Sequence, residues 1–334
     1  MTFREKNKIT YIYFILSILV ILIHSVNNES RFERFFSING IGQFATVLFF
    51  IISGFLFFRN LNNIYDVRRK LEKRVWTLLI PYLLWNLIYY VVHLIMKPGE
   101  GIDIFTIYDA AVNYKYNPAF WFVYQLILLN ILSLLFIYIL KDIKYIVAFY
   151  VVMAILIISA TDIPYINEDA IIYYFSSAVF SKLYNKNKVS FISKKNFFIM
   201  LLITSGLFVI NRFLYRYIQY GLYYYHFIFS VILVRLSVSF SIFYMIDFVF
   251  NYGKTYAFME NTFFLYSIHY MIVRFMVKCI QFLTLKIIPN SFSYPIEILF
   301  FVMSPLVCIA VSFYLSRFMK KRFLKAYNIL TGKR

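Results

Sequence analysis

Two histidines lie inside long apolar runs of this sequence, and their side chains could take a proton from a substrate. His24 follows the apolar run 18–23, and His269 follows the aromatic-rich run 264–268. An imidazole accepts a proton near neutral pH, as general-base catalysis requires, and apolar surroundings favour the neutral form that does so. Each could equally be a structural residue that hydrogen-bonds a neighbouring helix, and the sequence leaves both interpretations open.

Three basic residues could hold charged or polar parts of a substrate. Arg235 lies within an apolar segment, where a charge costs several kcal/mol, so it is expected to line a cavity or to pair with a carboxylate or a carbonyl. Lys73 and Arg74 end the basic stretch 68–74, which could bind the phosphates of a cytosolic donor because arginine holds phosphate with two hydrogen bonds. The alternative is the ordinary excess of positive charge in the cytoplasmic loops of membrane proteins.

The elements that position these side chains are predicted to be membrane-spanning helices. Hydrophobic residues make up 62% of the 334 residues, against about 45 to 50% in a soluble domain, and a spanning helix needs about 20 apolar residues. Segment 169–184 is short and rich in serine, so eight spans with one interfacial pair are an alternative. The predicted segments are 9–27, 41–58, 76–96, 120–140, 144–160, 169–184, 196–214, 223–249, 259–282 and 294–318.

The charge distribution favours a membrane protein with both termini in the cytoplasm. The net charge of +19 could indicate nucleic-acid binding, but the basic residues lie in short segments between apolar runs. With ten spans and a cytoplasmic N-terminus, most of the 34 Lys and Arg residues fall on the inner side, among them Arg4, Lys6 and Lys8. We therefore expect one membrane-embedded domain over residues 1–334, without a separate soluble domain.

Well-known catalytic motifs are absent from the sequence. It has no Walker loop, no paired-glycine dinucleotide motif, no His-Glu-x-x-His and no Cys-x-x-Cys. Nor has it the Gly-x-Ser-x-Gly of a serine nucleophile elbow. These absences argue against a nucleotide hydrolase, a Rossmann dehydrogenase and a serine hydrolase, and we expect neither a metal nor a bound cofactor.

Several short motifs, taken together and in order, resemble the acyltransferase 3 family of membrane-bound enzymes. They cover nearly the whole chain, and the helix count matches. The motifs are His24-Ser25 closing the first segment, residues 49–56 in the second, Arg74 followed by residues 80–85, residues 120–123 opening the fourth, and residues 266–269 in the ninth.

The resemblance implies transfer of an acyl group, usually acetyl from acetyl-CoA, to a sugar hydroxyl of a bacterial capsule or exopolysaccharide. His24 would be the catalytic histidine, and Lys73 and Arg74 would engage the acyl-CoA donor. Arg235, His269 and Trp121 are further candidates for substrate binding. Such an enzyme lies in the plasma membrane, takes a glycan or lipid-linked sugar as acceptor, and could associate with polysaccharide synthesis machinery.

Three positions depart from the family pattern. Many members carry Asp and Arg near the start of the first helix, where this chain has Thr10 and Tyr13, and a further basic residue where it has Thr77. A different donor mode, a different acyl group and loss of activity therefore all stay open.

Two other activities compete with acyl transfer. An exporter of a polysaccharide or lipid-linked sugar could line its path with Arg235, His269 and tyrosines, although the paired repeats of many transporters are not visible. A glycan polymerase ranks last, because the longest predicted outer loop, 97–119, has Lys97 and Lys115 as its basic residues and no arginine.

Overall fold

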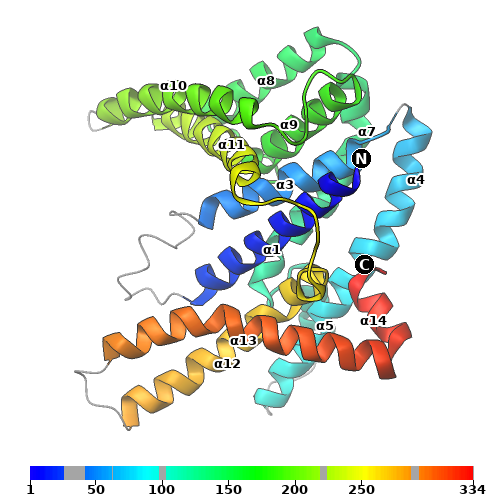
Figure 1. The fold of residues 1–334 in the computed structure, drawn as a ribbon, viewed down its shortest axis with the longest axis vertical. Coiled ribbons are helices and arrows are strands. Elements are labelled where there is room, and N and C mark those ends of the chain that lie inside the picture. The colour runs from blue at the N-terminus through cyan, green and yellow to red at the C-terminus, as the bar shows by residue number, and fades with distance from the viewer. Residues whose placement is uncertain (26–41, 62, 98–102, 219–223, 287–292, 334) are drawn as a thin grey trace. The chain divides into compact units, whose positions relative to one another are not determined.

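The computed structural model shows a helical protein and describes residues 1–25, 42–61, 63–97, 103–218, 224–286 and 293–333 (Figure 1). Within these ranges there are helices and connecting turns but no β-strand. The α-helices are α1 (Phe3–Ser25), α3 (Gly42–Phe58), α4 (Ile64–Arg74), α5 (Ile80–Met96), α6 (Ile104–Val112), α7 (Trp121–Ile139), α8 (Ile143–Ile158), α9 (Glu168–Asn185), α10 (Lys194–Ile218), α11 (Tyr224–Val249), α12 (Thr262–Lys286), α13 (Ser293–Arg322) and α14 (Leu324–Thr331). Three short helices are η1 (Val75–Leu79), η2 (Pro118–Phe120) and η3 (Ala257–Met259).

Each of the ten predicted segments overlaps a helix, apart from residues 26, 27, 41 and 223, which lie outside the described ranges, and the all-helical fold is confirmed. Six helices in the described residues are long and apolar enough to cross a membrane, and α3 and α8 are shorter apolar helices. The count of ten spans and the cytoplasmic location of the termini remain predictions. The six candidate spans are Phe3–Ser25, Ile64–Met96, Pro118–Ile139, Lys194–Ile218, Tyr224–Val249 and Ile298–Arg322.

The basic stretch 68–74, which the sequence suggested was a loop, is instead part of helix α4. Its Arg, Lys, Leu and Glu residues have high helix propensity. Asn63 caps the first turn, because its side-chain oxygen accepts the backbone N–H of Asp66 at 3.0 Å. Charge content suggested a loop, whereas local propensity and capping produce a helix.

Helix α4 continues into α5 through one π-helical turn, η1. The N–H of Ile80 bonds to the carbonyl of Val75, five residues back. Pro81 has no N–H for the carbonyl of Thr77, four residues before it, which accounts for the irregular turn. Gly332, at φ +63° after α14, lies so close to the backbone of Thr77 that a Cβ there would collide with it. The C-terminal helix thus packs against the π turn.

The chain forms two compact units that alternate along the sequence, and each is described by itself. Unit 1 comprises Met1–Ile12, Gln43–Leu71 and Leu128–Lys254, and unit 2 comprises Tyr13–Gly42, Glu72–Ile127 and Thr255–Arg334.

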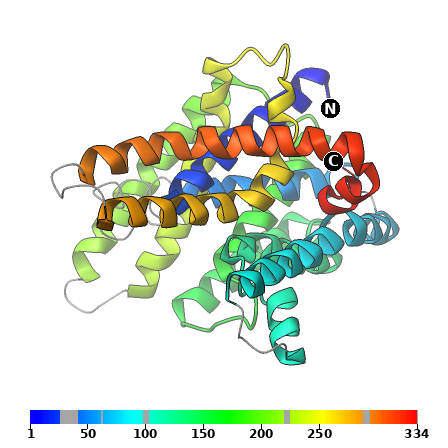
Figure 2. The same cartoon turned by 90° about the horizontal axis from the view of Figure 1, so that it is seen from below.

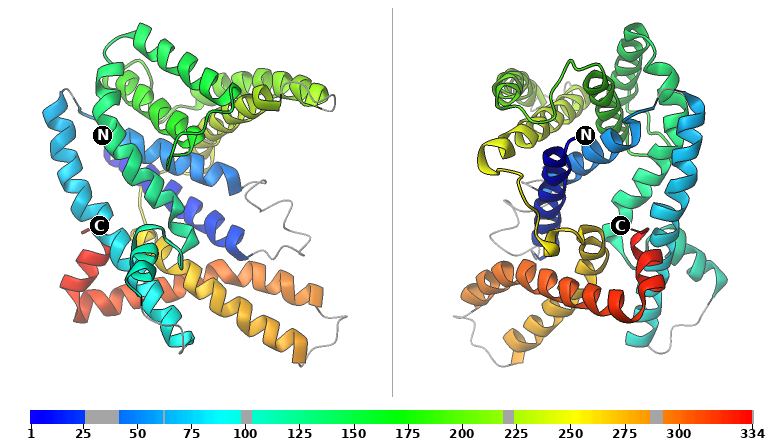
Figure 3. Two further views of the ribbon diagram at one scale, coloured as in Figure 1. Left: turned by 180° about the vertical axis from the view of Figure 1, so that it is seen from behind. Right: turned by 45° about the vertical axis from the view of Figure 1, so that its right-hand side comes forward.

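In unit 1, helix α3 packs closely on α9 through a glycine. A Cβ at Gly54 would collide with the hydroxyl of Ser177 and lie 3.1 Å from the carbonyl oxygen of Tyr174. This agrees with the expectation that Gly54 permits close helix approach. Helices α10 and α11 run side by side (Figures 1 and 3), joined by a 2.8 Å hydrogen bond from Asn211 to Ser230.

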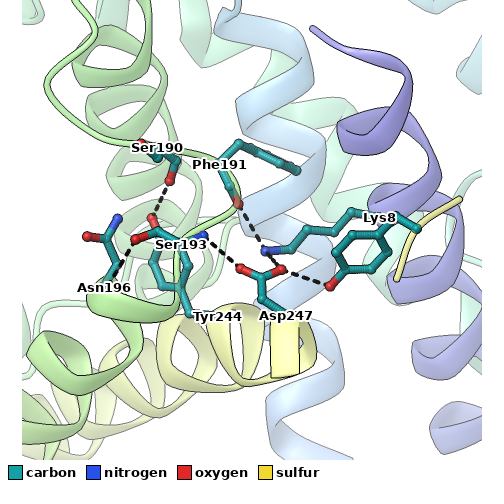
Figure 4. Close-up of polar contacts among 8 residues, drawn as sticks. Lys8, Ser190, Phe191, Ser193, Asn196, Tyr244 and Asp247 are labelled. Atoms are coloured by element: carbon teal, nitrogen blue, oxygen red, sulfur yellow. Dashed lines mark hydrogen bonds and ion pairs between the residues drawn. The ribbon is translucent and has the colours of Figure 1, made fainter. Parts of the chain in front are cut away.

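Unit 1 also contains a buried ion pair (Figure 4). The ammonium of Lys8 lies 2.7 Å from the carboxylate of Asp247, and both side chains are buried. Lys8 also donates to the carbonyl of Phe191 at 2.9 Å, and Asp247 accepts from the backbone of Ser193 at 2.9 Å and from the hydroxyl of Tyr252 at 2.8 Å. Lys8 was assigned to a cytoplasmic tail, but α1 begins at Phe3, so Lys8 is helical and buried.

In unit 2, helices α12 and α13 lie side by side (Figures 1 and 2). Helix α14 packs on α5, where Trp85 donates its indole N–H to the carbonyl of Leu330 at 2.9 Å. Asn261, just before α12, accepts from the hydroxyl of Tyr327 and the ammonium of Lys320, each at 2.8 Å. These contacts fix the helices that carry the candidate site.

Candidate active site

Unit 2 brings together the two histidines that follow apolar runs of the sequence. His24 is the penultimate residue of α1 and His269 lies in the first half of α12. Their ring centroids are 5.4 Å apart, and the His24 ring packs edge-on against Tyr270 at 5.3 Å. His24 is half-buried and His269 is buried. Two imidazoles from helices distant in sequence therefore share one location.

The hydrogen bonding of His269 defines which ring nitrogen can act on a substrate. Its Nδ1 lies 2.5 Å from the carbonyl oxygen of Tyr266. A carbonyl only accepts, so Nδ1 carries the hydrogen, and in the neutral ring Nε2 then has the lone pair. This Nε2 is buried and, among the residues that the structure describes, has no hydrogen-bond partner. It is an available proton acceptor beside His24.

Tyr89 of α5 holds the part of α12 that carries His269. Its hydroxyl donates to the carbonyl of Ser267 at 2.9 Å and accepts the N–H of Met271 at 3.1 Å. In a regular helix these two backbone groups would bond to each other, so the hydroxyl is inserted into the helical ladder. The insertion sets the local geometry of α12 around His269 and Tyr270.

Helix α1 is tied to α13 next to His24. The hydroxyl of Ser25 lies 2.6 Å from that of Ser304, and both residues are buried. Ser304 also donates to the carbonyl of Phe301 at 3.2 Å. Because Pro305 has no N–H to donate to that carbonyl, the serine substitutes for the missing helical bond. The contact holds the end of α1, and with it His24.

Arg274 is a charged neighbour of the pair that sequence reasoning missed. Its Nε donates to the hydroxyl of Tyr270 at 2.9 Å, and Tyr270 contacts His24. The sequence does carry the signal, since Arg274 lies within a predicted apolar segment, as Arg235 does. Tyr89 and Tyr270 are likewise not among the residues that the sequence predicts for the site.

The other predicted site residues lie elsewhere. Lys73 is exposed and Arg74 half-buried, at the end of α4 just before η1. Trp121 is the first residue of α7, and its neighbour Phe120 stacks on Tyr266 with centroids 5.8 Å apart. A π turn often marks a functional position in a helix, and here it directly follows the two basic residues.

Arg235 belongs to unit 1. Its Nε donates to the side-chain oxygen of Gln43 on α3 at 2.7 Å. It is also near enough to the carboxylate of Asp169 on α9 for their charges to interact. Arg235 thus has polar neighbours from two other helices.

No group of three or more His, Cys, Asp or Glu side chains within the described ranges could hold a metal ion.

The family model described as an acyltransferase domain matches residues 7–325, nearly the whole chain. No curated protein and no solved structure matches the chain.

Proposed function

The chain belongs to the acyltransferase 3 family, as its motifs predict, and from this premise we propose that it transfers an acyl group from acyl-CoA to a sugar hydroxyl. The observation that carries the proposal is the contact between His24 and His269 within a chain matched over residues 7–325. We propose acetyl-CoA as the donor and a cell-surface polysaccharide or its lipid-linked precursor as the acceptor.

In this proposal His24 is the general base. Its imidazole takes the proton of the acceptor hydroxyl while the hydroxyl oxygen forms a bond to the thioester carbonyl carbon. The carbon–sulfur bond then breaks, CoA leaves as its thiolate, and the thiolate recovers the proton. The products are an O-acyl sugar and free CoA thiol. In this proposal the Nε2 of His269, which is buried and whose ring packs on that of His24, accepts a hydrogen bond from the hydroxyl or from His24.

The donor is proposed to bind at Lys73 and Arg74. CoA carries several phosphates, which guanidinium groups hold with paired hydrogen bonds and lysine attracts as a point charge. Both residues stand at the end of α4, next to the π turn of the continuous helix Ile64–Met96. Thr77, which replaces a basic residue common in the family, lies within that turn.

The enzyme is proposed to be a multi-pass protein of the bacterial plasma membrane. Six candidate spans and the family support a membrane protein. A cytosolic donor and an outer glycan would then reach the site from opposite faces, with polysaccharide synthesis proteins as partners. Trp121 and Arg235 would contact substrate.

Export of a polysaccharide is the competing function, and one experiment separates the two. We would measure the O-acetyl content of surface glycan in cells with the wild-type chain and with His24→Ala at equal membrane abundance. His226→Ala, which removes an exposed histidine at the start of α11, is the matched control. Loss of acetyl groups in His24→Ala alone, with glycan still exported, supports the enzyme. Unchanged acetyl content with glycan retained in the cell would overturn it in favour of transport.

A further inference from the structure

A second cluster of buried polar groups in unit 2 lacks hydrogen-bond partners. Asn117 is fully buried, and in the described part of the chain neither its amide nitrogen nor its amide oxygen has a partner. The hydroxyl of Tyr90 and the side-chain oxygen of Asn86 are likewise buried and unpartnered there. A buried polar group without a partner is destabilising and needs an explanation, such as a ligand or an ordered water.

Asn86 and Tyr90 belong to α5, and Asn117 directly follows a residue that packs on Tyr90. Asn86 and Tyr90 are four residues apart and so lie on one face of α5. Asn86 donates to the carbonyl of Ala111 at 3.1 Å, which places this face against the end of α6. Asn117 lies in the turn before η2, and Tyr116 beside it packs on Tyr90 with centroids 5.3 Å apart.

The unpartnered atoms have the chemistry of a neutral polyhydroxyl ligand. An amide group offers donors and acceptors side by side, and the tyrosine hydroxyl offers one of each. Adjacent hydroxyls of a sugar ring need this combination. None of the three residues is charged, and the nearby ion pair of Asp109 and Lys115, 3.0 Å long in the described part of unit 2, is solvent-accessible. A charged ligand would lack a counter-ion, so a neutral sugar fits best.

Two aromatic rings lie at the edge of the cluster. His93 and Tyr116 are half-exposed, and their ring centroids are 4.3 Å apart. Aromatic rings present apolar faces against which the C–H face of a sugar can pack.

A row of packed aromatic rings connects Asn117 to the histidine pair within unit 2. Phe120 donates its N–H to the carbonyl of Asn117 at 2.9 Å and stacks on Tyr266 with centroids 5.8 Å apart and planes 10° apart. Tyr266 in turn packs on His269 at 5.4 Å, and His269 packs on His24. The polar cluster and the proposed catalytic residues are therefore parts of one packed structure.

We propose that Asn86, Tyr90 and Asn117 form a subsite that binds a neutral sugar ring of the acceptor glycan, with Tyr116 and His93 at its opening. The proposal rests on the proposed function in one respect, that the glycan is the acceptor. It assigns to this cluster the recognition of a sugar unit and leaves proton transfer to His24.

The test is sugar binding by the purified full-length protein, measured without acyl-CoA. Saturation-transfer NMR would use the methyl glycosides of glucose, galactose and N-acetylglucosamine as probes. We expect saturation of ring protons of at least one probe with the wild-type protein and with His24→Ala. Asn117→Leu, close in size but without the amide, should weaken binding about tenfold, the loss expected for one or two hydrogen bonds. Tyr90→Phe should weaken it also, whereas Tyr108→Phe, on the exposed face of α6, should not.

Two outcomes would overturn the subsite. One is absence of binding of all three probes to the wild-type protein. The other is that the Asn117→Leu variant binds the probes as well as the wild-type protein and melts at a higher temperature. This would show that only water occupied the cluster. The proposed function fails separately: sugar binding by a wild-type protein that shows no acyl transfer from acetyl-CoA would support the subsite and contradict the enzyme.

Discussion

Lys8 and Asp247 form an ion pair 2.7 Å long in which both side chains are removed from solvent. Phe191, Ser193 and Tyr252 supply the remaining hydrogen bonds of the two charges (Figure 4). Breaking such a pair by removing one partner costs about 3 to 5 kcal/mol, because the other charge stays buried, whereas replacing both with apolar residues often costs little. Removing one of the two charges is therefore expected to lower the stability more than removing both.

Lys8→Met should consequently destabilise the protein more than the double variant Lys8→Met with Asp247→Leu. Thermal unfolding in detergent should give melting temperatures for the wild type and the double variant that are higher than that of the single variant. Lys6→Met, two positions nearer the N-terminal end of α1 and exposed, is a control for loss of an α1 lysine. A double variant as unstable as the single one would show that packing of the lysine stem, rather than charge pairing, dominates.

Replacing Gly54 and Gly206 by alanine should change the stability in opposite directions, because only Gly54 lies where α3 closely approaches α9. Gly54→Ala introduces a Cβ that collides with Ser177 and should destabilise by about 1 to 3 kcal/mol, as overpacking does. Gly206→Ala on α10, where a Cβ meets nothing within 4 Å, should stabilise by up to about 1 kcal/mol through helix propensity. Ser177→Ala should partly rescue Gly54→Ala. Equal melting temperatures for the two glycine variants would contradict the packing seen here.

The sequence predicts the helices well because apolar length is a local property. Each of the ten predicted segments overlaps a helix, and both His24 and His269 were singled out from their apolar surroundings. Their contact could not be predicted, because it depends on how α1 and α12 pack and no local pattern links residues so far apart in sequence.

The errors have local physical causes. The sequence predicts a solvated charge at Lys8, because its partner Asp247 lies on a helix that is distant in sequence. The charge of the stretch 68–74 indicates a loop, but its helix propensity and its Asn63 cap make it part of α4. The polar cluster of Asn86 and Asn117 was not anticipated, since single asparagines in a sequence do not show whether their amides will be paired.

Arg74 should contribute to binding of the donor rather than to the chemical step. Arg74→Ala is expected to raise KM for acetyl-CoA about tenfold or more with little change in kcat, because a charge-assisted hydrogen bond contributes about 1.5 to 3 kcal/mol. Arg74→Lys should recover part of this loss, since lysine keeps the charge but not the paired hydrogen bonds. Lys144→Ala, an exposed lysine in the first turn of α8, is the control. A fall in kcat at unchanged KM would contradict donor binding by Arg74.

Tyr89 is expected to act as a positioning residue. Tyr89→Phe removes the hydroxyl that bridges Ser267 and Met271, so the ladder of α12 should close and shift His269. A misplacement of about 1 Å can lower the rate about a hundredfold, so kcat should fall while KM for both substrates changes little. Tyr108→Phe serves as the exposed control. If Tyr89→Phe lowers melting temperature but leaves kcat unchanged, the bridge is structural only.

His269→Asn separates a structural from a chemical role of the second histidine. An asparagine side-chain amide can still donate to the carbonyl of Tyr266, as Nδ1 of the imidazole does, but nothing replaces the acceptor Nε2. If Nε2 takes part in proton transfer with His24, the variant should fold normally and lose about 10² to 10⁴ in kcat, the usual contribution of a general acid or base. His269→Gln, which places a polar atom nearer to the Nε2 position, should retain more activity than His269→Asn. Full activity in His269→Asn would restrict His269 to holding α12 and leave His24 as the proton acceptor of the pair.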